Sequence, residues 1–249
     1  MKKFHFSFIL FSCCVASFAC AVIASGQSPS HETFDELLHQ YVSDEGAVNY
    51  NGFIADSLKL NAYLENLSNH APADGWSENE KIAYWINAYN AFTIRLIIRN
   101  YPVKSIKDLG GKLYKINTPW DIKFIHIGDE TYDLNNIENS ILRKQFKEPR
   151  IHFALNCASK SCPPLRREAY TGSKLDAQLN EQARKFINNP KFNIIKEHEA
   201  ELSKIFSWYR GDFSSPQMSF EAFISQWSPE VITSETDISY MAYDWSLNE

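Results

Sequence analysis

The chain has 249 residues, 44% of them hydrophobic, and a formal net charge of −5 at pH 7. A negative balance argues against nucleic acid as a partner, because phosphate binding needs clustered lysine and arginine. The length allows a sizeable core within a single domain.

Residues 1–24 show the pattern of a secretory signal peptide. Two lysines precede a hydrophobic run over residues 4–23 that contains no lysine, arginine or acidic residue, and small residues follow it. Cleavage before Ser25 removes both lysines and no carboxylate, so the net charge changes from −5 to −7. We therefore expect an exported protein, periplasmic or extracellular. Lipid attachment at Cys13 or Cys20, or an uncut run that spans the bilayer, would instead attach it to a membrane.

The rest of the chain shows no internal repeat and no low-complexity linker, so we expect one domain over residues 34–230. The polar residues 25–33 are predicted to be disordered. Residues 231–249 are assigned as a C-terminal extension.

Three helices are predicted in the first hundred residues, over 34–41, 58–67 and 77–100, from apolar side chains at helical spacing. The third begins with Ser77 and Glu80 in a capping-box arrangement and ends before Pro102. Its apolar residues cover most of the helix surface, which indicates a long buried central helix.

Asn87 and Asn90 lie off the polar arc of this central helix. A buried carboxamide without partners costs about 1–3 kcal/mol, so both side chains need hydrogen bonds. Bonds to a loop backbone are the favoured interpretation, because buried polar side chains usually bond to backbone. Contact with a substrate is the alternative.

A strand over 120–127, a turn at Gly128 and a second short strand predict a hairpin that carries His126. Asp133 then caps a helix predicted over 134–146. Glu138 falls on the apolar face of that helix and needs a partner, for which Arg150 is a candidate. Such a glutamate is either structural or suited to acid–base chemistry.

The segment from His152 to Pro164, HFALNCASKSCPP, contains the two cysteines that lie outside the N-terminal run. Alternating apolar residues predict a strand over 150–156, with His152 and Asn156 on one face. Cys157 follows at the strand end, where function is common.

A nucleophilic Cys157 needs a nearby base. Five residues of extended strand span about 16 Å, which places His152 too far from Cys157 unless the chain folds back. The other possible base–thiol pairs are His152 with Cys162 and His126 with Cys157.

A disulfide between Cys157 and Cys162 needs fewer assumptions than a cysteine–histidine pair. Four intervening residues can bring the two Cα atoms within the range for a disulfide, and export favours oxidation. It would shape the loop more than it would stabilise the fold. One C-x4-C pair is a weak zinc signal, so we expect no metal site. The chain also lacks a phosphate-binding glycine loop and a nucleophile-elbow motif, and no cofactor is expected.

A helix predicted over 175–188 and short strands over 192–195 and 202–206 complete an α+β domain, with helices packed on a small, mainly antiparallel sheet. Asp212, in an aromatic segment, is interpreted as capping a turn, although it could orient a catalytic histidine.

Several motifs together resemble the family called domain of unknown function 547, over about residues 34–226. In chain order these motifs are WINAYNA at 85–91, DLNNIENSILR at 133–143, PRIHFALNCASKSCPPL at 149–165 and SWYRGDF at 207–213. The resemblance implies a widespread, often exported bacterial protein but no known activity. The family motif includes positions corresponding to Asn87, Asn90, Glu138, His152, Cys157 and Cys162.

Two functions remain open. The first is a cysteine-dependent hydrolase or acyl transferase, with Cys157 as nucleophile, His152 or His126 as base, and Glu138 or Asp212 orienting that base. The candidate binding residues are Asn87, Asn90, Asn156 and Asp212. The second function is a non-catalytic extracytoplasmic binding domain with a Cys157–Cys162 disulfide; in either case the partner is an unidentified small molecule or peptide.

Overall fold

The computed structural model describes residue 1, residues 28–110 and residues 118–249. Apart from its first residue, the predicted signal peptide, residues 1–24, lies outside the described residues, as do residues 25–27. Among the described helices, none has both the length and the apolar character needed to cross a membrane.

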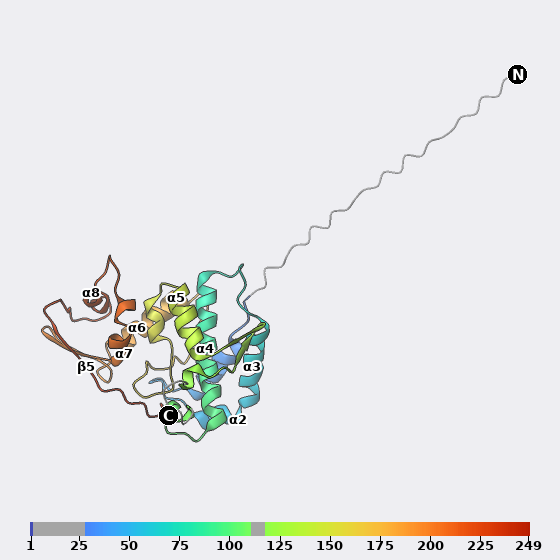
Figure 1. Cartoon of the computed structure of the whole chain (residues 1–249), viewed down its shortest axis with the longest axis horizontal. Coiled ribbons are helices and arrows are strands. Elements are labelled where there is room, and N and C mark those ends of the chain that lie inside the picture. Colours follow the sequence, from blue (N-terminus) through green and yellow to red (C-terminus); the bar gives the residue numbers. More distant parts are fainter. Residues whose placement is uncertain (2–27, 111–117) are drawn as a thin grey trace.

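Helices dominate the fold and surround one central helix, α4 (Figure 1). The first four helices are α1 (Glu32–Tyr41), α2 (Tyr50–Ala55), α3 (Ser57–Asn69) and α4 (Glu78–Asn100). Later in the chain come α5 (Arg143–Gln145), α6 (Leu175–Ile187), α7 (Lys204–Trp208) and α8 (Phe220–Ser225). Short 3-10 helices occupy Ile106–Leu109, Pro119–Asp121, Pro149–Phe153 and Arg210–Phe213, and a π-helix occupies Asn136–Leu142.

The central helix α4 forms as predicted. The side chain of Ser77 accepts a hydrogen bond from the backbone N–H of Glu80, and Glu80 bonds back to Ser77, which satisfies two free N–H groups at the helix start. Residues 82–94 of α4 are buried without interruption, so the expectation of a long buried helix is confirmed.

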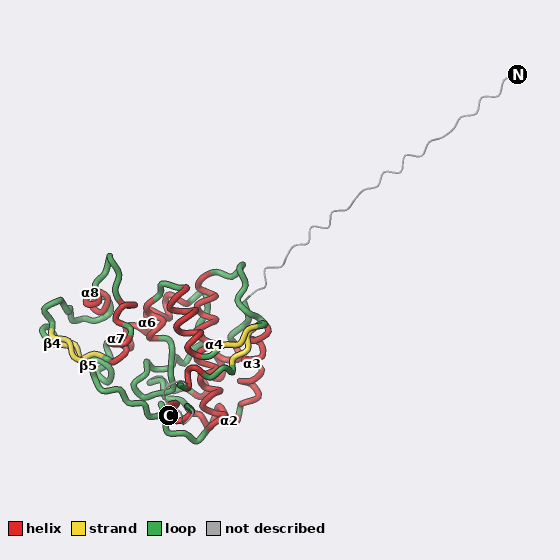
Figure 2. The backbone as a smooth tube through the Cα atoms, viewed as in Figure 1, coloured by secondary structure: helices red, strands yellow, loops and turns green. Residues whose placement is uncertain are grey.

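The strands are short and lie at two separate places (Figure 2). β1 (Ile125–Ile127) and β2 (Glu130–Tyr132) form the predicted antiparallel hairpin, with Gly128 at φ 58° in its turn. β3 (Ile194–Ile195) pairs antiparallel with β4 (Glu199–Leu202), which pairs in parallel with β5 (Asp237–Tyr240). The α+β class is confirmed, with two small sheets where one was expected.

Buried apolar side chains form two clusters. One surrounds α4 and includes α1 to α3, and the second lies between α6, α7 and α8. Phe153 belongs to the second cluster, whereas its neighbours Ile151 and Ala154 belong to the first. The segment before the cysteines therefore joins the two clusters.

Three strand predictions were wrong: one segment contains no strand, and the other two are strands only in part. Residues 150–156 form a 3-10 helix and a turn, because Glu148 caps the backbone of Arg150 and Ala154 donates its N–H back to Ile151 O at 2.9 Å. In the segment predicted over 120–127 only β1 is a strand, after a 3-10 helix. Residues 202–206 leave β4 and enter α7, whose start is capped by the Ser203 side chain.

Both ends of the predicted domain extend further than the sequence suggested. His31, within the segment predicted to be disordered, is buried and lies 2.8 Å from the Tyr63 hydroxyl, and α1 starts at the next residue. The assigned extension, residues 231–249, contains β5 and then returns to the first half of the molecule (Figure 1). There Val48 donates its N–H to Asn248 O at 2.8 Å. Residues 231–249 are therefore part of the domain.

Candidate active site

A cavity of about 270 Å³ lies beside the cysteine-bearing loop. Its wall combines a thiol pair, a histidine, a carboxylate and several aromatic rings. Its lining includes Glu138, His152, Cys157, Tyr209, Tyr243 and Trp208. They come from four separate segments of the chain, and only the tertiary structure brings them together.

His152 is buried and held by a carboxylate that lies 60 residues later in the chain. Its Nε2 lies 2.7 Å from Oδ2 of Asp212, and its ring stacks on Tyr209 at 4.0 Å between centroids. Among the described residues, Nδ1 of His152 has no hydrogen-bond partner. A histidine oriented through one nitrogen, with the other free, has the geometry of a general base.

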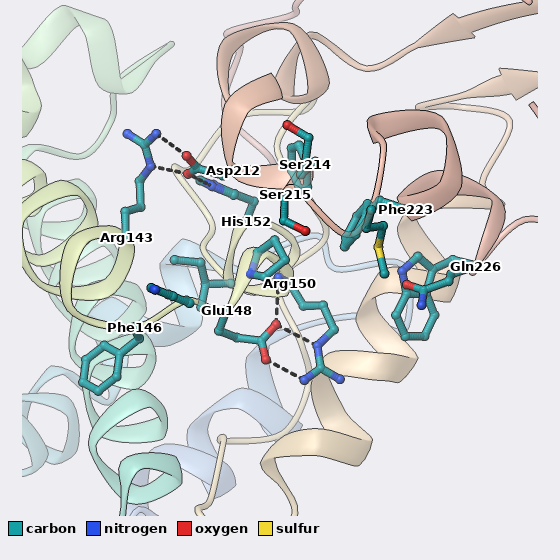
Figure 3. Close-up of a pocket in the computed structure, with 16 residues that line it drawn as sticks. Arg143, Phe146, Glu148, Arg150, His152, Asp212, Ser214, Ser215, Phe223 and Gln226 are labelled. Carbon is teal, nitrogen blue, oxygen red and sulfur yellow. Dashed lines mark hydrogen bonds and ion pairs between the residues drawn. The ribbon is translucent and has the colours of Figure 1, made fainter. Parts of the chain in front are cut away.

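Asp212 is fixed in turn by Arg143, which donates from Nε at 2.5 Å and from Nη2 at 2.9 Å (Figure 3). Burial raises the pKa of Asp212, but hydrogen bonds from His152 and Arg143 outweigh it and hold that pKa well below its ordinary value. Asp212 is therefore a permanent carboxylate beside His152. The favoured sequence interpretation, a turn cap, does not account for the contact between Asp212 and His152. The alternative, a carboxylate that orients a histidine, does.

Glu138 projects from the π-helix into the same cavity and accepts a hydrogen bond from the Tyr209 hydroxyl at 2.6 Å. In a π-helix the fifth residue closes the turn, so Glu138 and Arg143 lie on one side of it; in an α-helix they would differ by about 140°. The two side chains consequently both reach Tyr209, with the Arg143 guanidinium 4.8 Å from the ring centroid. The helix predicted over 134–146 is confirmed as a helix, but its π geometry was not foreseen. Arg150 does not pair with Glu138, because it binds Glu148 and Asp176.

Cys157 sits at a sharp turn. The next residue, Ala158, has a φ of 60°, a left-handed conformation that costs a residue with a Cβ about 1–2 kcal/mol. The side chain of Asn156 holds this turn, since its Oδ1 accepts the Ala158 N–H at 3.0 Å and its Nδ2 donates to Pro163 O at 2.9 Å. Asn156 thus shapes the loop and does not line the cavity.

The two cysteines are adjacent and carry free thiols in this structure. The backbone N–H of Cys157 donates to Sγ of Cys162 at 2.8 Å, and Sγ of Cys157 lies 3.2 Å from the Ser159 hydroxyl and 3.3 Å from that of Tyr243. Burial raises the pKa of Cys157, but hydrogen bonds from Cys162, Ser159 and Tyr243 prevail and lower it. Burial raises the pKa of Cys162 well above its ordinary value. Cys157 is therefore the more acidic thiol of the pair.

Asn87 and Asn90 lie outside the cavity and brace backbone. Asn87 pairs with both the N–H and the C=O of Tyr170, at 3.0 and 2.7 Å. Asn90 donates to Ala154 O and accepts from Asn156 N–H, both at 2.9 Å. The favoured interpretation of bonds to loop backbone is confirmed for both asparagines.

His126 also lies away from the cavity. It is exposed on β1, where its Nδ1 contacts the Thr131 hydroxyl at 3.1 Å. His152 lines the cavity instead, because the 3-10 turn at 149–153 folds the chain back and the distance expected from an extended strand does not apply.

A second, larger cavity of about 610 Å³ borders the other side of this polar group (Figure 3). His152 lines both cavities, and Asp212 and Arg143 line the second. Glu148 and Arg150 pair with each other at its edge.

Sequence reasoning missed the aromatic residues of the site, Tyr209, Trp208, Tyr243 and Trp245. Trp208 and Tyr209 belong to the same aromatic segment as Asp212, and Trp208 is 45% exposed. The one signal in the sequence that could have indicated these site residues is the crowding of large aromatic residues, since exposed apolar patches often mark binding sites. Tyr243 and Trp245 fall in the segment assigned as an extension.

Within residues 28–110 and 118–249, no three histidine, cysteine or acidic side chains are arranged to hold a metal ion. The fold and the site together define an α+β protein with a cysteine, a histidine and a glutamate around a small aromatic cavity, and with an aspartate that binds the histidine from outside it. Residues 73–187 match the family described as "Protein of unknown function, DUF547", so this part of the chain is similar to that family. The match is shorter than the resemblance at 34–226 and ends before Asp212. Comparisons with curated proteins and with solved structures found no similar chain.

Proposed function

We propose that the cavity is the active site of a cysteine-dependent hydrolase or acyl transferase. Cys157 is the nucleophile, His152 the general base, and Asp212 positions the base. The observation that carries the proposal is that a buried histidine, held by a carboxylate, lines the same cavity as a thiol with a lowered pKa.

The chemistry follows from these roles. His152 accepts the proton of the Cys157 thiol, the sulfur attacks an acyl carbon, and a carbon–sulfur bond forms as the bond to the leaving group breaks. The proton passes from His152 to the leaving group. Water, or a second nucleophile, then cleaves the thioester and frees the thiol. The hydroxyls of Ser159 and Tyr243, both near Sγ, stabilise negative charge there.

An acylation experiment tests this proposal. The protein over residues 28–249, mixed with p-nitrophenyl acetate, is expected to release a burst of nitrophenol close to one equivalent, with the acetyl group on the Cys157 peptide in a mass spectrum. Cys157→Ser abolishes the burst. His152→Asn slows it about a hundredfold or more, the usual contribution of a general base.

His126→Asn serves as the matched control, because this histidine is exposed and outside the cavity. An equal loss with His126→Asn and His152→Asn, or acetylation spread over several residues, would rule out the proposed site.

A second candidate is a non-catalytic binding domain for a small molecule or peptide, with a Cys157–Cys162 disulfide that shapes the loop. The observation in its favour is the adjacency of the two cysteines, 2.8 Å from one backbone nitrogen to the other sulfur. Thiol titration of the unfolded, unreduced protein decides between them: two free thiols in residues 28–249 support the enzyme, and none supports the bridge.

Either function belongs to an exported protein, and export through residues 1–24 is part of the proposal. It rests on the hydrophobic run behind two lysines. Fusion of residues 1–24 to an alkaline phosphatase reporter should give activity outside the cytoplasm, and the mature mass should correspond to a start at Ser25. A lipidated cysteine at the new N-terminus would support the membrane-anchored alternative.

A further inference from the structure

Glu138 is the starting point, because no lysine or arginine among the described residues bonds to its carboxylate. The residue is only 8% exposed, and its Oε1 accepts a hydrogen bond from the Tyr209 hydroxyl. Among the described residues no donor reaches Oε2, and no lysine or arginine forms an ion pair with Glu138. Buried charges in proteins are paired or hydrogen-bonded throughout, so this one calls for a cation.

No lysine or arginine lines the cavity among the described residues. Arg143 attracts Glu138 electrostatically, but its guanidinium gives two hydrogen bonds to Asp212 and one to Asn139. Glu138 thus faces a small cavity with no cation of the described residues bonded to its carboxylate.

Much of the remaining wall consists of aromatic rings, which also attract cations. Tyr209, Tyr243, Trp208, Trp120 and Trp245 line the cavity, and Trp208 packs against Tyr243 at 4.8 Å between centroids. Ring faces attract ammonium groups through their quadrupole, most strongly for tryptophan and in desolvated sites. The chain itself shows this affinity, since Lys107 places its Nζ 3.7 Å from the centroid of Trp245.

We propose that this cavity binds a positively charged group, a primary amine or a quaternary ammonium, between the Glu138 carboxylate and the aromatic rings. The consequence for chemistry, which rests on the function proposed above, is that Cys157 acts on acyl substrates that carry a cationic group. About 270 Å³ holds a small ammonium group, so the rest of the substrate extends outside.

Choline and its neutral isostere 3,3-dimethylbutan-1-ol are the probes that isolate the charge. Binding is measured by tryptophan fluorescence in the Cys157→Ser protein at constant ionic strength, so no reaction interferes. Choline is expected to bind about tenfold or more tighter than the alcohol. Equal affinity for the two probes, or no binding of choline, overturns the proposal, and this comparison needs no variant that could unfold.

Variants then assign the preference to residues. Glu138→Gln should reduce the choline preference about tenfold, whereas Glu130→Gln, which removes an exposed carboxylate on β2, should not change it. Trp208→Leu should weaken choline, and Trp208→Phe should restore part of the affinity, because the ring is the attractive group. A preference that survives Glu138→Gln unchanged would contradict the role of the carboxylate.

A second measurement separates this inference from the proposed function. Acetylcholine and 3,3-dimethylbutyl acetate are compared as acylating agents of the unsubstituted protein. Faster acylation by acetylcholine supports both proposals. Acylation at equal rates keeps the enzyme and overturns the cation preference, while selective choline binding without any acylation keeps the cation site and overturns the enzyme.

Discussion

At the scale of single residues, the acidity of the Cys157 thiol results from opposing neighbours. Burial and the charge of Glu138 raise its pKa, while hydrogen bonds from Cys162, Ser159 and Tyr243 lower it. The net effect lowers the pKa of Cys157. Each neighbouring side chain can therefore be removed in turn, and the direction of the resulting pKa shift tests its role.

Removal of the Tyr243 hydroxyl should make Cys157 less reactive. Tyr243→Phe deletes a hydrogen bond to the sulfur, which raises the pKa of Cys157 and slows alkylation by iodoacetamide at pH 7 by roughly two- to tenfold. Glu138→Gln should act in the opposite direction, because it removes a negative charge near the thiolate. The measurement is the pH dependence of the alkylation rate of the reduced protein, and shifts of the same sign for both variants would refute this account.

His31 predicts a specific pH dependence of stability. Burial lowers its pKa from 6.5 to about 4, so between these values the unfolded chain binds more protons than the folded one. Stability therefore rises with pH in this window, and on acidification from pH 6.5 to about 4 we expect the free energy of unfolding to fall by about 3 kcal/mol. Urea unfolding at several pH values measures it.

The His31→Gln protein serves as the comparison, since it lacks the titrating ring and should show a flatter profile in this window. Carboxylates such as Glu168, whose pKa is held at about 2 by hydrogen bonds from Arg166 and Lys174 against the effect of burial, lose their contribution only below about pH 4.5. An identical slope between pH 6.5 and 4.5 for both proteins would exclude His31 as the source.

At the scale of elements, the central helix positions the site through its asparagines. Asn90 bonds to the backbone on both sides of Leu155, and Asn156 then fixes the turn at Cys157. The π-helix is the second positioning element, because it turns Glu138 and Arg143 toward the same tyrosine.

Asn90→Ala tests this bracing. It leaves the carbonyl of Ala154 and the N–H of Asn156 without their partner in a buried place, which should destabilise the protein by about 2–4 kcal/mol. Chemical denaturation measures the loss. Asn100→Ala at the exposed end of the same helix should stay within about 0.5–1 kcal/mol of the unsubstituted protein, and equal losses at the two positions would contradict a special role for Asn90.

At the scale of the whole molecule, residues 244–247 hold the cysteine-bearing loop in place through backbone hydrogen bonds. Lys160 N–H donates to Ser246 O at 2.9 Å, Ser161 N–H donates to Asp244 O at 3.2 Å, and Ser159 bridges to Leu247. The cysteine loop is therefore held by residues more than 80 positions later in the chain, in addition to Asn156.

A chain ending at Tyr240 should lose protection at this loop. We expect the backbone amides of Lys160 and Ser161 to exchange with solvent much faster, because their acceptors are gone, while amides in the buried middle of α4 remain slow. Hydrogen exchange with mass spectrometry reads both regions in one experiment. Unchanged exchange at 159–162 would show that the loop is held without the C-terminal segment.

The sequence by itself determined the local features of this protein. The capping box at Ser77 and Glu80 and the cap at Asp133 were readable because their partners lie three residues apart. The unusual positions of Asn90 and Glu138 were readable for a similar reason, since helical periodicity defines which face is covered.

Only the tertiary structure decided which polar residues share a site. His152 meets Asp212 across 60 residues, and Tyr243 meets Cys157 across 86; contacts over such separations depend on packing between elements and leave no local periodicity. Packing between elements also decides that His126 lies outside the cavity. Alternating apolar residues at 150–156 also fit a turn whose neighbouring side chains enter two different clusters, so periodicity alone predicted a strand where a 3-10 turn brings His152 into the cavity.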